Sequence, residues 1–156
     1  MKNDAMSIMI SDATINDLDA LYNIEKECFT LEAFTKELIA ALLQKPDSIS
    51  LLAKIKGEIV GFAIALIHQR KNRKIGHIFT IDVATRARKG GVGLVLMKNL
   101  EQKLTEKGAK SCYLEVRVDN TAARKLYKKL GYSETRFVKD FYYSGGDCVV
   151  MRKNLQ

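Results

Sequence analysis

The chain has 156 residues, of which 47% are hydrophobic and 28% charged, and it contains a single proline. This length and composition predict one globular domain over residues 1–156 and exclude a disordered chain. The formal net charge of +8 is compatible with an anionic ligand, with RNA or with a solvated basic face, so charge alone does not decide the function.

The sequence offers no signal for a membrane, for secretion or for a metal. The longest apolar run, Ile59 to Ile67, is less than half as long as a spanning helix, and the N-terminal MKNDAMS lacks a hydrophobic core. The three cysteines form no CxxC pair, and the two histidines provide no zinc spacing. We therefore expect a cytoplasmic protein with free thiols, no membrane association and no metal.

Apolar periodicity predicts strands and helices that alternate along the whole chain. Taken in chain order, the expected elements are a strand over 7–12, helices over 16–27 and 34–43, strands over 48–55, 59–70 and 75–83, a helix over 92–107, a strand over 111–118, a helix over 120–130, and strands over 133–141 and 148–153. Asn16 and Asp17 are the expected caps of the first helix, and Pro46 ends the second. Gly108 and Gly131 end the last two helices. We expect a mixed, mostly antiparallel seven-stranded sheet with four helices on both faces.

A glycine-rich basic stretch, RARKGGVG at residues 86–93, lies between an expected strand and the start of a helix. Bare backbone at a helix N-terminus, with unpaired N–H groups and added cations, is suited to a phosphate. A P-loop is excluded because no Lys-Ser/Thr ending follows the glycines, and a GxGxxG dinucleotide loop fails because Leu96 occupies its third glycine position. Glu115 does lie about where a ribose-binding acid would be expected, but in mid-strand.

The six residues from Arg88 to Gly93 match the pattern R/Q-x-x-G-x-G/A and resemble the pyrophosphate loop of the GNAT superfamily of acetyl-CoA-dependent N-acetyltransferases. Three neighbouring segments strengthen the resemblance. GHIFTIDV is similar to the family's fourth strand, YLEVRVDNTAARKLYKKLGY to its following strand and helix, and FYYSGGDCVVMRKNL to the closing hairpin of enzymes that acetylate protein N-termini. Within the superfamily, the chain is most similar to the ribosomal-protein alanine and archaeal N-terminal acetyltransferases.

The resemblance implies a site for acetyl-CoA along the fourth strand and the glycine loop. Ile81, Asp82 and Val83 would pair with the pantetheine arm, and a backbone N–H near Val83 would stabilise the oxyanion. Arg88 and Lys89 would offset the pyrophosphate charge. Asn120 matches a CoA-contacting asparagine, although a helix cap explains it equally well. The N–H groups expected to hold the phosphate oxygens are those of Gly90, Gly91, Val92, Gly93 and Leu94.

In this branch, a glutamate and a tyrosine twelve residues later move the protons, and here they are Glu115 and Tyr127. Strand alternation turns Glu115 away from the apolar face, and helical spacing places Tyr127 on a partly buried stripe with its hydroxyl in need of a partner. Taken alone, the glutamate could be simply solvated and the tyrosine simply packed. No cysteine matches a nucleophile position, which predicts direct attack in a ternary complex.

His77 is a further candidate, because relatives in the eukaryotic branch carry a histidine where Glu115 stands. It would share the role of base, or it is a strand histidine bonded to a backbone carbonyl, and the second alternative is favoured. The loop between the first two helices, with Phe29, Glu32 and Phe34, would form one wall of a peptide groove. Tyr142 and Tyr143 would form the opposite wall.

The function expected from the resemblance is transfer of the acetyl group of acetyl-CoA to the α-amino group of a protein N-terminus. A ribosomal protein or nascent chain is the expected partner, with no specific nucleic acid, and the protein is expected to be a monomer or weak dimer. Two alternatives stay open. One is a GNAT enzyme acting on lysine ε-amines or a small amine, and the other is a basic RNA- or ribosome-binding domain that uses CoA only as a ligand.

Overall fold

The computed structural model describes residues 7–29, 32–142 and 145–155. Their strands form one seven-stranded sheet in the order β1-β2-β3-β4-β5-β7-β6, in which only β4 and β5 pair in parallel. The bounds are β1 Ile8–Asp12, β2 Ser48–Ile55, β3 Glu58–Arg70, β4 Arg73–Val83, β5 Ala109–Arg117, β6 Ser133–Val138 and β7 Cys148–Asn154. The predicted mixed, mostly antiparallel sheet is confirmed.

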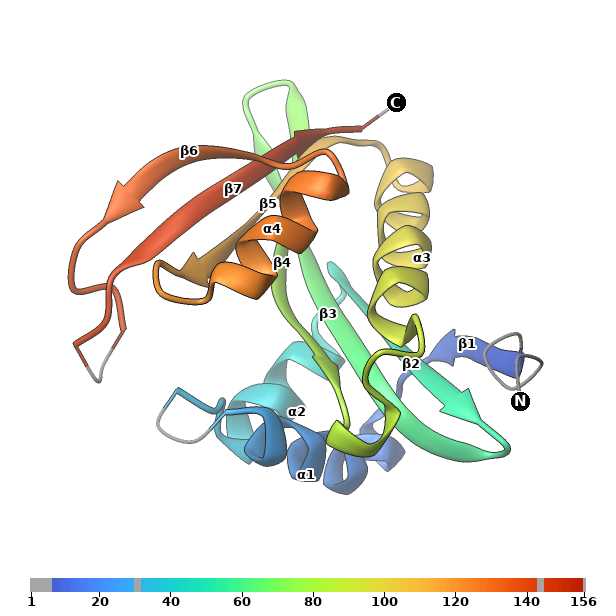
Figure 1. The fold of residues 1–156 in the computed structure, drawn as a ribbon. Coiled ribbons are helices and arrows are strands. Elements are labelled where there is room, and N and C mark those ends of the chain that lie inside the picture. The colour runs from blue at the N-terminus through green and yellow to red at the C-terminus, as the bar shows by residue number, and fades with distance from the viewer. Residues whose placement is uncertain (1–6, 30–31, 143–144, 156) are drawn as a thin grey trace.

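Four helices cover the two faces of this sheet, as predicted (Figure 1). On one face lie α3 (Val92–Glu106) and α4 (Thr121–Lys129), and on the other lie α1 (Leu18–Cys28) and α2 (Lys36–Gln44). Helix α3 buries Leu96, Leu100 and Leu104 completely. Burial of each leucine side chain stabilises the folded state by about 1.5–3 kcal/mol. This packing holds α3 against the sheet, and so fixes the position of its first turn relative to β4. None of the described helices is long and apolar enough to cross a membrane.

Several predicted element boundaries were wrong by a few residues, and in two of these cases a side chain caps or turns the backbone. Thr35 accepts a hydrogen bond from the N–H of Leu38, so α2 begins two residues later than predicted. Strand β6 ends at Val138 instead of residue 141, because Asp140 adopts a positive φ and its N–H bonds the Asp147 carboxylate. Asp17 stands at the N-cap position of α1, as predicted, but its side chain makes no cap hydrogen bond to that helix, and Thr14 caps the 3-10 turn that precedes it.

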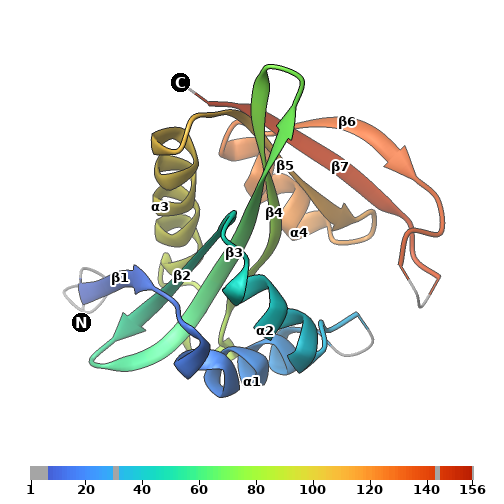
Figure 2. The same cartoon turned by 180° about the vertical axis from the view of Figure 1, so that it is seen from behind.

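The two hydrophobic clusters are distributed unequally along the sheet. The cluster beneath α3 and α4 extends over β5 and β7, through Leu114, Val116 and Met151. The cluster beneath α1 and α2 takes its strand residues only from β2, β3 and β4. Viewed from that side, α1 and α2 lie over one end of the sheet, and no helix lies in front of β5, β7 and β6 (Figure 2).

Candidate active site

Strands β4 and β5 separate halfway along their length, and the candidate site is the opening between them. Their parallel pairing ends at His77 and Tyr113. A bulge in the β3–β4 ladder, beside Ile64 and Ala65, bends β4 just beyond this point. The residues of β4 after His77 therefore have an edge without a partner strand. A cavity of about 230 Å³ occupies the opening, lined by residues of both strands and of α4.

The backbone of Ile81 and Val83 faces this open edge. The N–H of Ala84 donates to the carbonyl of Val60 in β3, and successive residues of a strand direct their backbone groups to opposite sides. The backbone of Asp82 therefore bonds to β3, while its neighbours on either side face the opening. This arrangement fits the predicted contacts of Ile81 and Val83 and departs from the one predicted for Asp82.

The glycine loop lies next to the open edge. A Cβ atom added to Gly93 would lie 3.7 Å from Cγ2 of Val83, which is ordinary van der Waals contact. Gly91 is the N-terminal cap of α3 with φ 84°, a conformation that favours glycine, and no side chain caps the helix. Lys89 also has a positive φ, of 66°, which the motif did not predict. The N–H groups of the first turn, at Val92, Gly93 and Leu94, have no acceptor within the helix and suit an anion.

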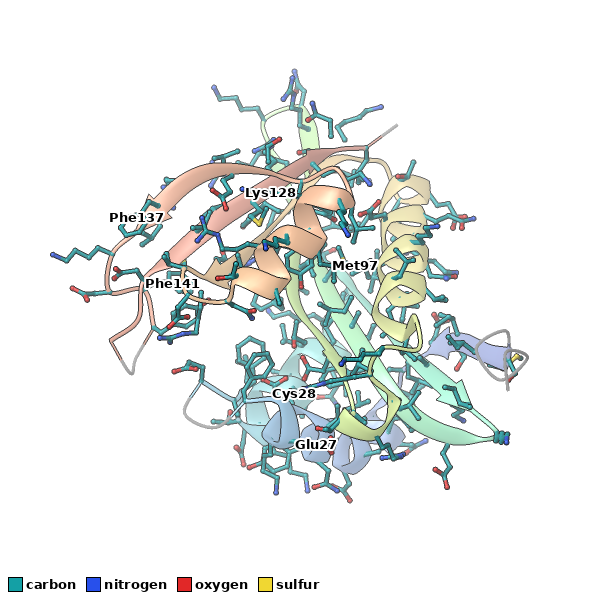
Figure 3. The ribbon with its side chains drawn as sticks, in the orientation of Figure 1. Glu27, Cys28, Met97, Lys128, Phe137 and Phe141 are labelled. Carbon is teal, nitrogen blue, oxygen red and sulfur yellow. The ribbon has the colours of Figure 1, made fainter. Side chains whose placement is uncertain are left out.

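Arg88 is turned inward from this loop. Its Nε donates to the carbonyl oxygen of Val83 at 3.1 Å and its Nη2 lies 3.4 Å from the thiol of Cys28. Cys28, labelled in Figure 3, is the last residue of α1. The guanidinium thus ties the loop to β4 and α1, and its positive charge remains close to the helix start.

Glu115 and His77 form a pair at the point where the strands part. The Nε2 of His77 is 2.8 Å from the Oε1 of Glu115, and the two side chains are only 15% and 20% exposed. The imidazole stacks on Tyr113 at 4.4 Å and contacts Phe79 at 4.2 Å between ring centroids. The favoured prediction, a histidine bonded to a backbone carbonyl, was wrong, because the parallel register of β4 and β5 brings a carboxylate to the ring instead.

Glu115 lines two adjoining cavities, which also share Phe29, Glu32 and Tyr142. The cavity in the opening also contains Tyr127, from α4, and Asn120. The second cavity, of about 400 Å³, contains His77 and the aromatic residues Phe29, Phe34, Phe141 and Tyr142. The carboxylate of Glu115 therefore has access to a ligand in either space, which is the geometry required of a group that moves a proton between two reactants.

Tyr127 lines the first cavity. Burial, with a smaller effect of the Asp82 charge, raises the pKa of Tyr127 to about 12. The phenol is therefore protonated near neutral pH. Its ring meets Tyr132 edge-on at 5.9 Å. Asn120 caps α4 by accepting a hydrogen bond from the N–H of Ala123 at 3.1 Å. The helix cap, which the sequence offered as the alternative to a CoA contact, is therefore present.

The two predicted walls of the peptide groove are joined by Arg117, a residue that the sequence did not single out. Its guanidinium forms ion pairs with Glu32 at 3.3 Å and Asp119 at 3.1 Å, and lies 5.2 Å above the ring of Tyr142. A Cβ atom on Gly146 would overlap this guanidinium. Phe29, Glu32, Phe34 and Tyr142 thus face the second cavity, whereas Tyr143 lies outside the described residues.

A buried carboxyl pair beneath β4 was also missed, because its members are far apart in the sequence. The hydroxyl of Thr80 is 2.6 Å from Oδ1 of Asp82 and 3.3 Å from Oε1 of Glu25, and both acids are 1% exposed. A hydroxyl carries one hydrogen, so one of these two contacts requires a proton on a carboxyl group. Burial, and then the neighbouring Glu25, raise the pKa of Asp82 to about 9.

This pair connects β4 to the loop after α1. The second oxygen of Glu25 accepts a hydrogen bond from the N–H of Phe34 at 3.0 Å. Glu25 therefore holds Phe34, one of the predicted groove residues, against the same strand that borders the opening. Among the residues that the structure describes, no group of three or more histidines, cysteines or acids is arranged to hold a metal ion.

Comparison with known proteins gives a consistent result. The sequence model of the acetyltransferase (GNAT) family matches residues 18–132. The N-alpha-acetyltransferase of Sulfurisphaera tokodaii is 28% identical over 151 residues, covering 91% of this chain and 90% of the relative. That of Sulfolobus acidocaldarius is 30% identical over 148 residues, covering 89% and 88%. The crystal structure of the ribosomal-protein-S18-alanine N-acetyltransferase from Escherichia coli superposes with a TM-score of 0.86, at 26% identity, covering 96% and 94%.

Proposed function

This chain belongs to the acetyltransferase (GNAT) family, and we propose that it transfers the acetyl group of acetyl-CoA to the α-amino group of a protein N-terminus. The observation that carries the proposal is the position of Glu115, which is paired with His77 and lines both the cavity between β4 and β5 and the adjoining aromatic cavity. Relatives named for N-alpha acetylation, and for an alanine of ribosomal protein S18, support a protein N-terminus as substrate. A ribosomal protein or a nascent chain is the proposed partner.

The residues around the opening fit acetyl-CoA. The uncapped start of α3 presents N–H groups for a pyrophosphate, and the unpaired edge of β4 presents alternating N–H and carbonyl groups for the amide-containing pantetheine arm. Gly90 to Leu94 would hold the phosphate oxygens, with Lys89 and the inward-turned Arg88 adding positive charge. When bound, acetyl-CoA supplies the thioester carbonyl to be attacked and the thiol that leaves.

Glu115 is the proposed base. An α-amino group has a pKa of about 8, so a weak base is enough to take the proton that the amine loses as its nitrogen bonds to the carbonyl carbon. The proton moves to Glu115 directly or through one water molecule, and His77 holds the carboxylate in place from the other side. The N–H of Val83, on the open edge, is the proposed donor to the oxyanion.

Tyr127 is the proposed acid. As the carbon–sulfur bond breaks, negative charge develops on sulfur, and the protonated phenol donates to it. A thiol has a pKa of about 8.5, well below that of Tyr127, so the phenol acts first as a hydrogen-bond donor that stabilises the departing thiolate. No thiol of the chain is placed as an alternative nucleophile. Burial raises the pKa of Cys112 to about 11 and also raises the pKa values of Cys28 and Cys148.

The test is acetylation of a peptide panel with Ser, Ala, Met or Glu at the N-terminus and a lysine inside. Mass spectrometry of the products locates each acetyl group. We expect acetylation of α-amines, and Glu115→Gln is expected to lower kcat/KM by about 100-fold. Glu37→Gln, at an exposed position of α2, is the matched control and should retain full activity. Acetyl groups found only on lysine ε-amines would overturn the proposed substrate class.

A further inference from the structure

We propose that a basic groove beside the active site binds an acidic segment of the substrate polypeptide, downstream of the residue that is acetylated. The proposal rests on the function proposed above and adds a substrate class to it. The basic groove is a cavity of about 730 Å³ whose charged lining residues are Arg70, Arg136, Arg152 and Glu115. It is larger than either cavity at the opening between β4 and β5.

The groove lies on the sheet face that carries α1 and α2, over the part formed by β5, β7 and β6, where no helix covers it. Its floor is made by Tyr113 and Glu115 of β5 and by Val150 and Arg152 of β7. These residues alternate along the two strands with residues of the core. Tyr113 lies opposite Arg152, and Glu115 opposite Val150. On the other side of β7, Arg136 of β6 is also paired with Val150. The β3–β4 hairpin, which extends past the sheet in Figure 2, forms the other side and contributes Arg70.

The positive charge of the groove is not neutralised within the protein. Among the residues that the structure describes, Arg70, Arg136 and Arg152 take part in no ion pair. Arg152 is held by a hydrogen bond from its Nη2 to the hydroxyl of Ser111, at 2.8 Å. The one carboxylate in the lining, Glu115, is already paired with His77. Three cations from three strands therefore face a common space that suits an anionic partner.

The groove adjoins the site of the reaction, because Glu115 borders it as well as the two cavities described above. A polypeptide whose α-amine lies against Glu115 can direct its following residues along this face of the sheet. A polypeptide also suits both ends, since an amine is attracted by the carboxylate and acidic side chains by the arginines. A phosphate backbone would meet the Glu115 carboxylate at the same end, where like charges repel.

The experiment compares two peptides with the same first two residues and either four glutamates or four glutamines at positions three to six. Acetylation gives kcat/KM, and fluorescence anisotropy of the labelled peptides gives Kd in the presence of CoA. We expect a preference of about fivefold to tenfold for the acidic peptide in both measurements, decreasing as salt rises. Arg70→Gln/Arg136→Gln, at two exposed positions, should abolish the preference, so that the variant uses the acidic and the glutamine peptide with the same kcat/KM. Lys98→Gln/Lys103→Gln on α3 removes the same charge elsewhere and should retain the preference.

Equal use of the two peptides by the wild type, or a preference that survives in the arginine variant, would overturn the proposal. So would loss of binding to a labelled RNA 20-mer in the arginine variant with peptide selectivity intact, which would assign the groove to nucleic acid. If neither peptide is acetylated but the acidic one still binds through the two arginines, the proposed function fails and the groove assignment stands.

Discussion

Replacing Asp82 by asparagine tests whether the folded protein keeps a proton between Glu25 and Asp82. The pKa of Asp82 is raised from an ordinary 3.8 to about 9, so the folded protein holds a proton that the unfolded chain releases. The stabilisation from this group is complete below about pH 3.8 and is lost as pH rises towards 9.

The structure gives the size of the expected effect. One proton held only by the folded state lowers the free energy of unfolding by about 1.4 kcal/mol for each pH unit in that window. Between pH 5 and pH 8 the wild type should therefore lose up to about 4 kcal/mol through this pair. Asparagine retains an oxygen for Thr80 and an amide for Glu25 but has no proton to release, so this part of the pH dependence should vanish.

Urea unfolding of the wild type and of Asp82→Asn, at unit steps from pH 5 to pH 8 and constant ionic strength, measures the difference. The variant should gain stability relative to the wild type as pH rises, with the same m-value. Asp47→Asn, at an exposed aspartate, is the control and should follow the wild type. Free energies for Asp82→Asn and wild type that remain parallel over the whole range would show that both acids are ionised in the folded protein, and would refute the shared proton.

Three further changes test the site and the scaffold that positions it. Tyr127→Phe removes the phenolic proton but little volume, so kcat should fall about 10- to 100-fold with the KM for acetyl-CoA nearly unchanged; steady-state kinetics at saturating peptide measure both, and normal turnover would remove the acid role. Gly91→Ala forces a side chain into φ 84° in otherwise open space, which should cost about 1–2 kcal/mol of stability and raise the KM for acetyl-CoA. Gly57→Ala is the control, at φ 81° in the equally open turn between β2 and β3. It should cost the same stability and leave KM unchanged. Gly76→Ala places a Cβ 2.7 Å from Cδ2 of the buried Leu104, and thermal unfolding should show a loss of about 1–3 kcal/mol. Because Leu104→Ala removes the overlapping atoms, the loss in the double variant should be smaller than the sum of the two single losses.

The glycine loop and the order of the elements could be predicted from the sequence, because both depend on neighbours along the chain. The four-residue spacing of Val92, Leu96, Leu100 and Leu104 predicts α3 and its buried face, and the structure buries all four. The alternation of Leu114 and Val116 with Glu115 predicts that the carboxylate faces away from the core. A turn, a helix face and a strand face are local properties, so these expectations hold without knowledge of any distant contact.

The chemistry at Glu115 was decided by the tertiary structure. His77 is 38 residues away, and whether it meets a carbonyl or this carboxylate depends on the parallel register of β4 against β5 and on the bulge that parts them. The same is true of Arg117 with Glu32, and of Asp82 with Glu25 across the interface between β4 and α1. A residue pattern specifies which way a side chain points, but the distance between two side chains on different elements is set by how those elements pack, and proton transfer depends on that distance.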